Sequence, residues 1–285
     1  MKEQVIFIEP RKTFMEILNV HNQEVPFANI LAFYFRPKEN HKLGTLFLDA
    51  LLGTKFKNIG EQSTEKTILK IPTYDLNSVS VIVEQPTELK KRIDILIITD
   101  TFIVCIEFKI NHDLNNPLTE YKKYVEKEFK QKEKYYFILT PYEKEAIGEA
   151  KEYFEKNNEF KQIILSHFIK SIDDKIKINP LKYKINEEYQ YYKDFIQTVK
   201  NRKIRSERTK FLENIKNKLN IKSEYHTNIN GGFLEIKKGK IALKVRFTSM
   251  GIQIEKWDKK FEKLIYQPNK NLRIDNLVKV INTYR

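Results

Sequence analysis

The segment RIDILIITDTFIVCIEFKI, residues 92–110, constrains the fold of this 285-residue chain more than any other stretch. Two apolar runs rich in β-branched residues flank the polar pair Asp100-Thr101, a pattern typical of two buried strands joined by a short turn. Yet Asp94 lies in the first run, and Glu107 and Lys109 lie in the second. An unpaired buried charge costs several kcal/mol, so these three residues require a specific explanation.

The geometry of a hairpin predicts where these charges lie relative to one another. If Asp100-Thr101 is the centre of a two- or four-residue loop, facing positions have residue numbers that sum to 201, which pairs Asp94 with Glu107. Lys109 lies two residues beyond Glu107 and therefore shares its face. A three-residue loop would separate the two carboxylates, and the absence of glycine leaves the turn type open.

Two facing carboxylates repel each other unless a cation lies between them. Carboxylate oxygens and a backbone carbonyl suit Mg²⁺ or Mn²⁺, which also accept phosphate oxygens. A neighbouring lysine can orient or help to deprotonate a water molecule at the metal, or stabilise charge on a transferring phosphate. Asp94, Glu107 and Lys109 therefore indicate metal-assisted hydrolysis of a phosphodiester. The alternative is an edge strand with a surface ion pair, because Glu-x-Lys occurs by chance in lysine-rich chains.

Positive charge is concentrated at one end of the chain. Residues 201–285 contain 21 Lys and Arg against 8 Asp and Glu, whereas residues 1–200 contain 31 against 30. This contrast predicts two domains, 1–200 and 201–285, with a boundary near 200–210. A basic segment suggests a polyanion partner, although a solvated lysine-rich surface has the same composition. The candidate nucleic-acid contacts are Arg202, Lys203, Arg205, Arg208, Lys210, Lys244 and Arg246.

Hydrophobic periodicity predicts the remaining elements of secondary structure. Helices are expected from residue 24 to Pro37, at 46–52, 117–133 and 142–157, in a short stretch that begins at 171, and at 186–219 and 276–284. Strands are expected at 66–75, 78–85, 134–141 and 161–168. The alternating pattern of 223–257 predicts an antiparallel meander of about four strands.

Composition narrows the class of protein. No apolar run approaches the roughly 20 residues that cross a bilayer, and the first residues lack the features of a signal peptide, so we expect a cytoplasmic protein without a membrane partner. Cys105 is the only cysteine, which argues against a disulfide framework and a cysteine-based zinc site. The histidines show no spacing typical of metal ligands.

The residues Asp94, Glu107, Phe108 and Lys109 resemble the signature of the PD-(D/E)xK nuclease superfamily. The runs RIDILII, VCIEFKI, LTEYKKY, YYFILTP and IILSHFIKSI are similar to a bacterial branch of that superfamily, and so is EVPFANILAFYFRPKENHKLGTLFLDALL upstream. The likeness covers roughly residues 20–175.

Two features depart from that branch. Phe27-Ala28 stands where the branch has His-Ser, and Pro117-Leu118 stands where it often has Gln-Leu. The glutamine, where present, supports the site by hydrogen bonding. Its replacement leaves the three signature residues intact and puts the groups that support them in doubt.

The resemblance implies an α/β fold, a mixed central sheet flanked by helices with a restriction-endonuclease-like core, which the C-terminal α+β meander domain would follow. It also implies a Mg²⁺-dependent (or Mn²⁺-dependent) endonuclease site. Asp94, Glu107 and the Phe108 carbonyl would hold the metal, and Lys109 would act on the attacking water. By position, Glu24 would be an additional helix acid near the metal, although a first-turn glutamate is also favoured by the helix dipole alone.

We expect DNA to be the substrate, held by the basic domain, and lone nucleases of this branch resemble components of anti-phage defence. RNA is the alternative substrate, because nothing in the sequence recognises the 2′-hydroxyl. A different kind of protein is the second alternative: a non-catalytic protein with a nuclease fold that binds nucleic acid or a partner. The presence of all three residues Asp94, Glu107 and Lys109 argues against it. A homodimer or a defence-system partner protein would suit double-strand cutting, and no residue decides this.

Overall fold

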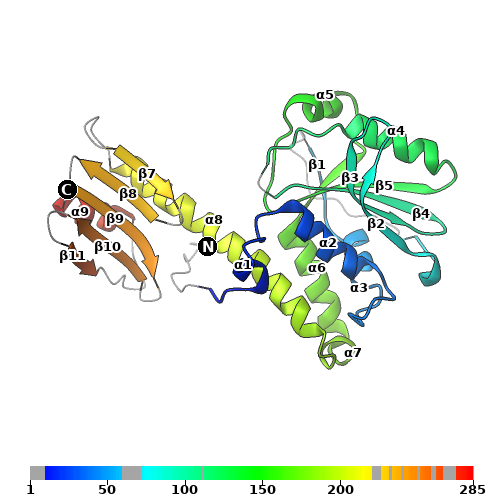
Figure 1. The fold of residues 1–285 in the computed structure, drawn as a ribbon, viewed down its shortest axis with the longest axis horizontal. Coiled ribbons are helices and arrows are strands. Elements are labelled where there is room, and N and C mark those ends of the chain that lie inside the picture. The colour runs from blue at the N-terminus through cyan, green and yellow to red at the C-terminus, as the bar shows by residue number, and fades with distance from the viewer. Residues whose placement is uncertain are drawn as a thin grey trace. The chain divides into compact units, whose positions relative to one another are not determined.

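The computed structural model describes residues 10–59, 72–110 and 112–219, and the segments 226–230, 233–238, 241–248, 251–257, 261–265 and 274–284 (Figure 1). The chain divides into two compact units, Thr13–Val199, and Lys200–Arg285 together with Met1–Lys12. This division lies at the edge of the boundary region expected from the charge distribution. The assignment of a function to each unit stays a prediction.

A mixed six-stranded sheet forms the centre of the larger unit. Its strands are β1 (Lys57–Asn58), β2 (Ser80–Pro86), β3 (Arg92–Ile98), β4 (Phe102–Phe108), β5 (Glu133–Thr140) and β6 (Phe160–Ile164). The spatial order is β1-β6-β5-β4-β3-β2, in which β5 pairs in parallel with both β4 and β6 and the other neighbours are antiparallel. Every residue of β4 is buried, because helices cover the sheet on both sides.

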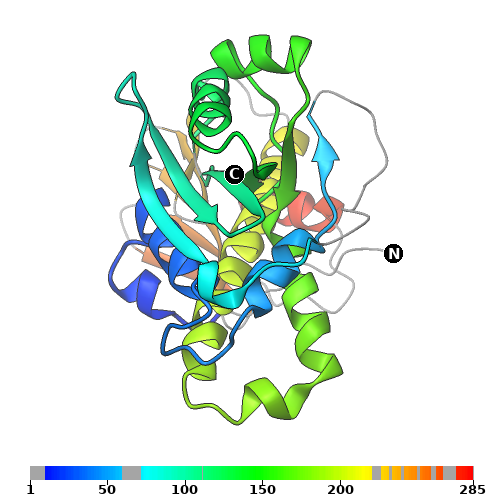
Figure 2. The same ribbon diagram turned by 90° about the vertical axis from the view of Figure 1, so that its right-hand side faces the viewer.

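Helices form a layer on each face of this sheet (Figure 2). The helices α4 (Leu118–Glu128) and α5 (Gly148–Lys156) share a core with one face, which includes Ile103 and Cys105 of β4. The other face, with Val104 and Ile106, packs against a larger group of helices. That group is α1 (Phe14–Ile17), α2 (Glu24–Phe35), α3 (Leu46–Leu52), α6 (Leu165–Ile178), α7 (Pro180–Lys184) and the start of α8 (Tyr189–Lys218). The expected α/β class, a mixed sheet flanked by helices, is confirmed.

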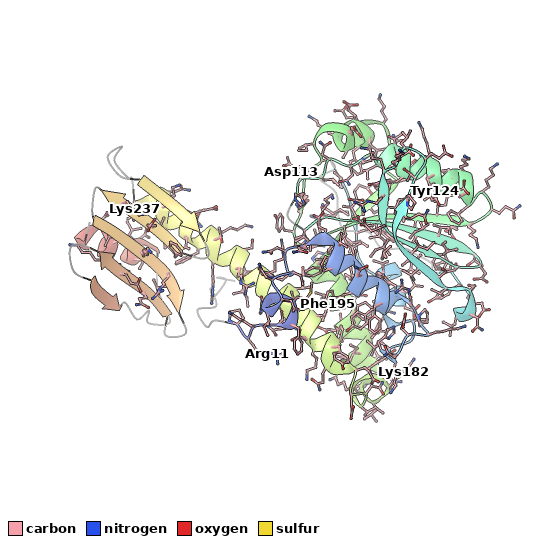
Figure 3. The ribbon with its side chains drawn as sticks, in the orientation of Figure 1. Arg11, Asp113, Tyr124, Lys182, Phe195 and Lys237 are labelled. Atoms are coloured by element: carbon pink, nitrogen blue, oxygen red, sulfur yellow. The ribbon has the colours of Figure 1, made fainter. Side chains whose placement is uncertain are left out.

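Aromatic packing joins α2 to the end of β4. The ring of Phe27 is stacked on that of Phe108 with their centroids 5.7 Å apart, and it lies 5.6 Å from the ring of Phe195, which Figure 3 labels. Phe27 and Phe108 are completely buried. This contact fixes the first turn of α2 beside the strand end that carries the charged residues.

Most elements expected from periodicity are present, although several begin or end elsewhere. The helices expected from residue 24 to Pro37, at 46–52 and at 117–133 correspond to α2, α3 and α4. The helix α4 ends at Glu128, before the expected residue 133, and buries the apolar stripe Leu118, Tyr121 and Val125. The short helix expected from residue 171 lies within α6. The strand expected at 161–168 is wrong beyond residue 164, because β6 ends there and α6 begins at once. The helix expected at 142–157 begins only at Gly148. Residues 66–71 of the strand expected at 66–75 lie outside the described residues, and 72–75 are not a strand.

The smaller unit contains an antiparallel five-stranded sheet of order β11-β10-β9-β8-β7. Its strands are β7 (His226–Asn230), β8 (Phe233–Lys238), β9 (Ile241–Thr248), β10 (Gly251–Trp257) and β11 (Phe261–Ile265). The last turns of α8 and the helix α9 (Ile274–Tyr284) share a core with β8, β9 and β10. The expected meander thus has a fifth strand, β11. None of the described helices is long and apolar enough to span a membrane.

Candidate active site

The hairpin of β3 and β4 has the register that the sequence predicted. Ile95 pairs with Ile106 and Ile98 with Ile103, so that facing residue numbers sum to 201. Thr99 N–H donates to the Phe102 carbonyl at 3.0 Å, which leaves Asp100-Thr101 as a two-residue loop. The paired residues end with Ile95 and Ile106, and Asp94 and Glu107 are the next residues along β3 and β4. There Phe108 N–H donates to Asp94 Oδ2 at 2.7 Å.

Both carboxyl groups of this pair are held in surroundings that oppose their ionisation. The Glu107 side chain is 1 % exposed, and burial followed by the charge of Asp94 raises the pKa of Glu107 well above its ordinary value. Burial also raises the pKa of Asp94 from 3.8 to about 6, although the hydrogen bond from Phe108 N–H opposes this. The pair therefore carries an electrostatic cost that a bound cation would relieve.

Lys109 follows the end of β4 and lies between two acids. Its Nζ is 2.9 Å from Glu107 Oε1 and 3.3 Å from Glu24 Oε2, and the lysine side chain is 11 % exposed. Burial alone would lower the pKa of Lys109, but the two carboxylates outweigh it and raise that pKa. The lysine is therefore an ammonium ion at neutral pH, which suits it to attract and orient anionic or polar groups.

Glu24 is the first residue of α2, where the helix dipole favours an acid. Its Oε1 accepts the Ile110 N–H at 2.9 Å and lies 3.4 Å from His112 Nδ1. Burial tends to raise the pKa of Glu24, yet Lys109 and the Ile110 N–H together lower it. The structure thus brings Glu24 to Lys109 from a helix 85 residues earlier in the chain.

Asn116, which the sequence did not single out, contacts Glu107 directly. Asn116 Nδ2 donates to Glu107 Oε1 at 2.6 Å. Asn116 lies in the loop that contains Asp113, labelled in Figure 3, and directly precedes Pro117. The signal in the sequence was a polar residue directly before Pro117-Leu118. The hydrogen bond to Glu107 is donated from this position.

The second oxygen of the Glu107 carboxylate has different surroundings from the first. Glu107 Oε2 is buried and accepts no hydrogen bond from the described residues. No cluster of three His, Cys, Asp or Glu residues suited to a metal ion occurs within the described part of the chain. The donor set that fits a hard cation is therefore the pair Asp94 and Glu107, with a backbone oxygen in addition. The Phe108 ring points into the core, and the part of its carbonyl as a ligand stays a prediction.

The basic residues expected to contact nucleic acid all belong to the smaller unit. Five lie on α8, where Lys203 and Lys210 are exposed, whereas Arg208 is 4 % exposed and does not present its side chain to solvent. Lys244 and Arg246 lie on β9, with Lys244 3.7 Å from Glu235 and Arg246 paired with Glu255. These acids reduce the net charge of that sheet face.

Comparison with known families agrees with this geometry. Residues 13–211 match the model of the PD-(D/E)XK nuclease superfamily, a match that covers more than half of the chain and includes Glu24, Asp94, Glu107 and Lys109. No curated protein and no solved structure matches the chain significantly.

Proposed function

We propose, from the premise that this chain belongs to the PD-(D/E)XK nuclease superfamily, that it is an endonuclease that hydrolyses phosphodiester bonds in DNA with the help of Mg²⁺ or Mn²⁺. Membership in this superfamily indicates a nuclease. One observation carries the proposal further: at the end of a buried hairpin Asp94 accepts the N–H of Phe108, the residue next to Glu107, and Glu107 Oε2 accepts no hydrogen bond from the described residues.

The residues present fit a divalent cation. The carboxylates of Asp94 and Glu107 would hold it together with the Phe108 carbonyl, and the buried, unpartnered Glu107 Oε2 is the atom that most needs such a partner. When bound, the ion would activate a water molecule and neutralise charge on the phosphate. The identity of the ion, Mg²⁺ or Mn²⁺, is part of the proposal.

Lys109 would orient the attacking water and stabilise negative charge on the phosphate. Its raised pKa favours these two roles over removal of a proton from water, because an ammonium ion has no lone pair to accept one. Glu24, 3.3 Å from Lys109 Nζ, would keep the ammonium group in place and keep it protonated. Glu24 is thus a positioning residue for Lys109. The sequence also suggested a second role for Glu24, a contact with the metal through water.

The smaller unit would hold the nucleic acid. Residues 201–285 carry 21 Lys and Arg against 8 Asp and Glu, and phosphate contacts by such residues are strong and independent of base sequence. We assign these contacts to Arg202, Lys203, Arg205, Lys210, Lys244 and Arg246. Arg208 is left out because its side chain is buried. A part in anti-phage defence is proposed from the resemblance alone, and plating efficiency of phage on expressing cells would test it.

A panel of substrates tests the proposal. Supercoiled plasmid, circular single-stranded DNA, linear duplex and RNA of the same sequence are incubated with the full chain, either wild type or Glu107→Gln, in Mg²⁺ or in Mn²⁺. We expect wild type to cut the closed circles, since an endonuclease needs no free end, and Glu107→Gln to cut nothing. Cleavage of RNA alone would support the ribonuclease alternative. Binding without cleavage of any substrate, with either metal, would support a non-catalytic protein.

A further inference from the structure

The two carboxylate oxygens of Glu107 are treated differently by their surroundings. Oε1 accepts hydrogen bonds from Lys109 Nζ at 2.9 Å and from Asn116 Nδ2 at 2.6 Å, whereas Oε2 is buried and accepts none from the described residues. A carboxylate held by two donors on one oxygen has a fixed orientation. Its other oxygen is then presented in one direction.

Asn116 is itself held in place by its neighbours. Its side chain opposes the rise that burial causes in the pKa of Tyr121, which is 3 % exposed on the first turn of α4. The loop before it is tied to the segment that leads into α5, because Ile147 N–H donates to the Leu114 carbonyl at 2.9 Å and Glu149 N–H donates to Asn115 Oδ1 at 2.9 Å.

Close packing reinforces this anchor at Gly148. Gly148 has φ +52°, and a Cβ at this position would lie 2.3 Å from Asn115 Oδ1. No residue with a side chain could replace Gly148 without moving Asn115. The loop position of Asn116 therefore depends on the fold and not on Asn116 alone.

We infer that Asn116 is a positioning residue that fixes the Glu107 carboxylate so that Oε2 faces a divalent cation. The inference rests on the proposed function, since it concerns the same carboxylates. An amide suits this task better than a second lysine, because it donates a hydrogen bond without adding positive charge that would repel the cation.

The test measures binding of Mn²⁺ alone to the full chain, by calorimetry and by water-proton relaxation at pH 7.5 without nucleic acid. Outer partners of metal ligands typically contribute 10–100-fold to affinity, so we expect Asn116→Ala to weaken Mn²⁺ binding about tenfold or more. Asn116→Gln keeps the amide donor and is expected to restore most of the affinity. Asn157→Ala is the matched control, because it removes an amide that donates to the Tyr153 carbonyl at the end of α5.

Each outcome decides the inference. If wild type binds Mn²⁺ and Asn116→Ala binds it with the same affinity, the inference is overturned and the proposed function stands. No Mn²⁺ binding by wild type would overturn the proposed function and the inference together. Melting temperatures in EDTA show whether each variant is folded. If Asn116→Ala is not, Asn116→Ser replaces it, since serine keeps a polar side chain in the loop but is too short to reach Glu107 Oε1, and unchanged affinity in that variant would overturn the inference.

Discussion

Replacing Asp94 by asparagine is expected to make the metal-free protein more stable at neutral pH while removing its nuclease activity. The Asp94 carboxyl is partly buried beside Glu107, and burial raises its pKa from 3.8 to about 6. Asparagine has the same shape and keeps an oxygen that can accept the Phe108 N–H, but it carries no charge. The substitution therefore removes the cost of burying the charge and leaves the hydrogen bond.

The size of the effect follows from the pKa shift. A shift of about two units corresponds to about 3 kcal/mol, which partial exposure to solvent reduces to about 2 kcal/mol. Because the pKa is raised in the folded state, the wild type is not penalised below pH 3.8 and loses stability as the pH rises through about 6. The advantage of Asp94→Asn should therefore be near zero below pH 4, grow between pH 4 and 6, and stay constant above.

The assay is thermal unfolding in EDTA from pH 4 to 8, followed by circular dichroism. For a unit of this size about 2 kcal/mol corresponds to a rise of roughly 5 °C in melting temperature at pH 7.5. Asp100→Asn is the matched control on the same hairpin, since Asp75 N–H and the Ser78 hydroxyl donate to its carboxylate and it should gain nothing. A variant Asp94→Asn that is no more stable than wild type at pH 7.5 would refute the reasoning that the buried charge of Asp94 destabilises the metal-free fold.

Three further predictions concern other parts of the chain. His41 is buried and accepts the Leu43 N–H at Nδ1, and burial lowers its pKa. In thermal unfolding, wild type should therefore lose more stability than His41→Gln as the pH falls from 7 to 5. Equal losses of stability in the two proteins would contradict this. Phe27→Ala should lower the free energy of unfolding in urea by about 3–5 kcal/mol, because the ring is fully buried. A decrease of less than about 1 kcal/mol would show that α2 does not pack on β4 as described. The double variant Lys203→Ala/Lys210→Ala should weaken the binding of every DNA sequence, as measured by fluorescence anisotropy. The slope of log K against log salt concentration should become shallower by about 2, because two phosphate contacts are lost. An unchanged slope would show that these lysines do not contact DNA.

The sequence predicted the centre of the candidate site because strand periodicity is simple. Side chains alternate between faces, so once the turn is located at Asp100-Thr101, the pairing of β3 with β4 follows by arithmetic. The burial of β4 could also be predicted, because this strand contains a continuous apolar run. The α2, α3 and α4 helices were predictable because proline, glycine and an apolar stripe mark their limits.

Features that depend on tertiary contacts could not be derived in this way. The proximity of Glu24 to Lys109 follows from packing between Phe27 and Phe108, and only the resemblance pointed to it. Asn116 lies in a loop without periodicity, and its contact with Glu107 depends on how Asn115 and α5 hold that loop. The end of β6 was misplaced because a short apolar run such as IILSHF suits a strand or a helix equally well.

The measurement that tests the central claim most directly is nicking of supercoiled plasmid by wild type, Lys109→Ala and the surface control Lys130→Ala, each in Mg²⁺, Mn²⁺ or EDTA. If Asp94, Glu107 and Lys109 form a metal-dependent nuclease site, wild type and Lys130→Ala cut with a metal and stop in EDTA. Lys109→Ala should then lose at least about a hundredfold in rate, the loss typical of one electrostatic group at a reacting centre. Cutting that persists in EDTA, or at the wild-type rate in Lys109→Ala, would contradict this assignment of the site.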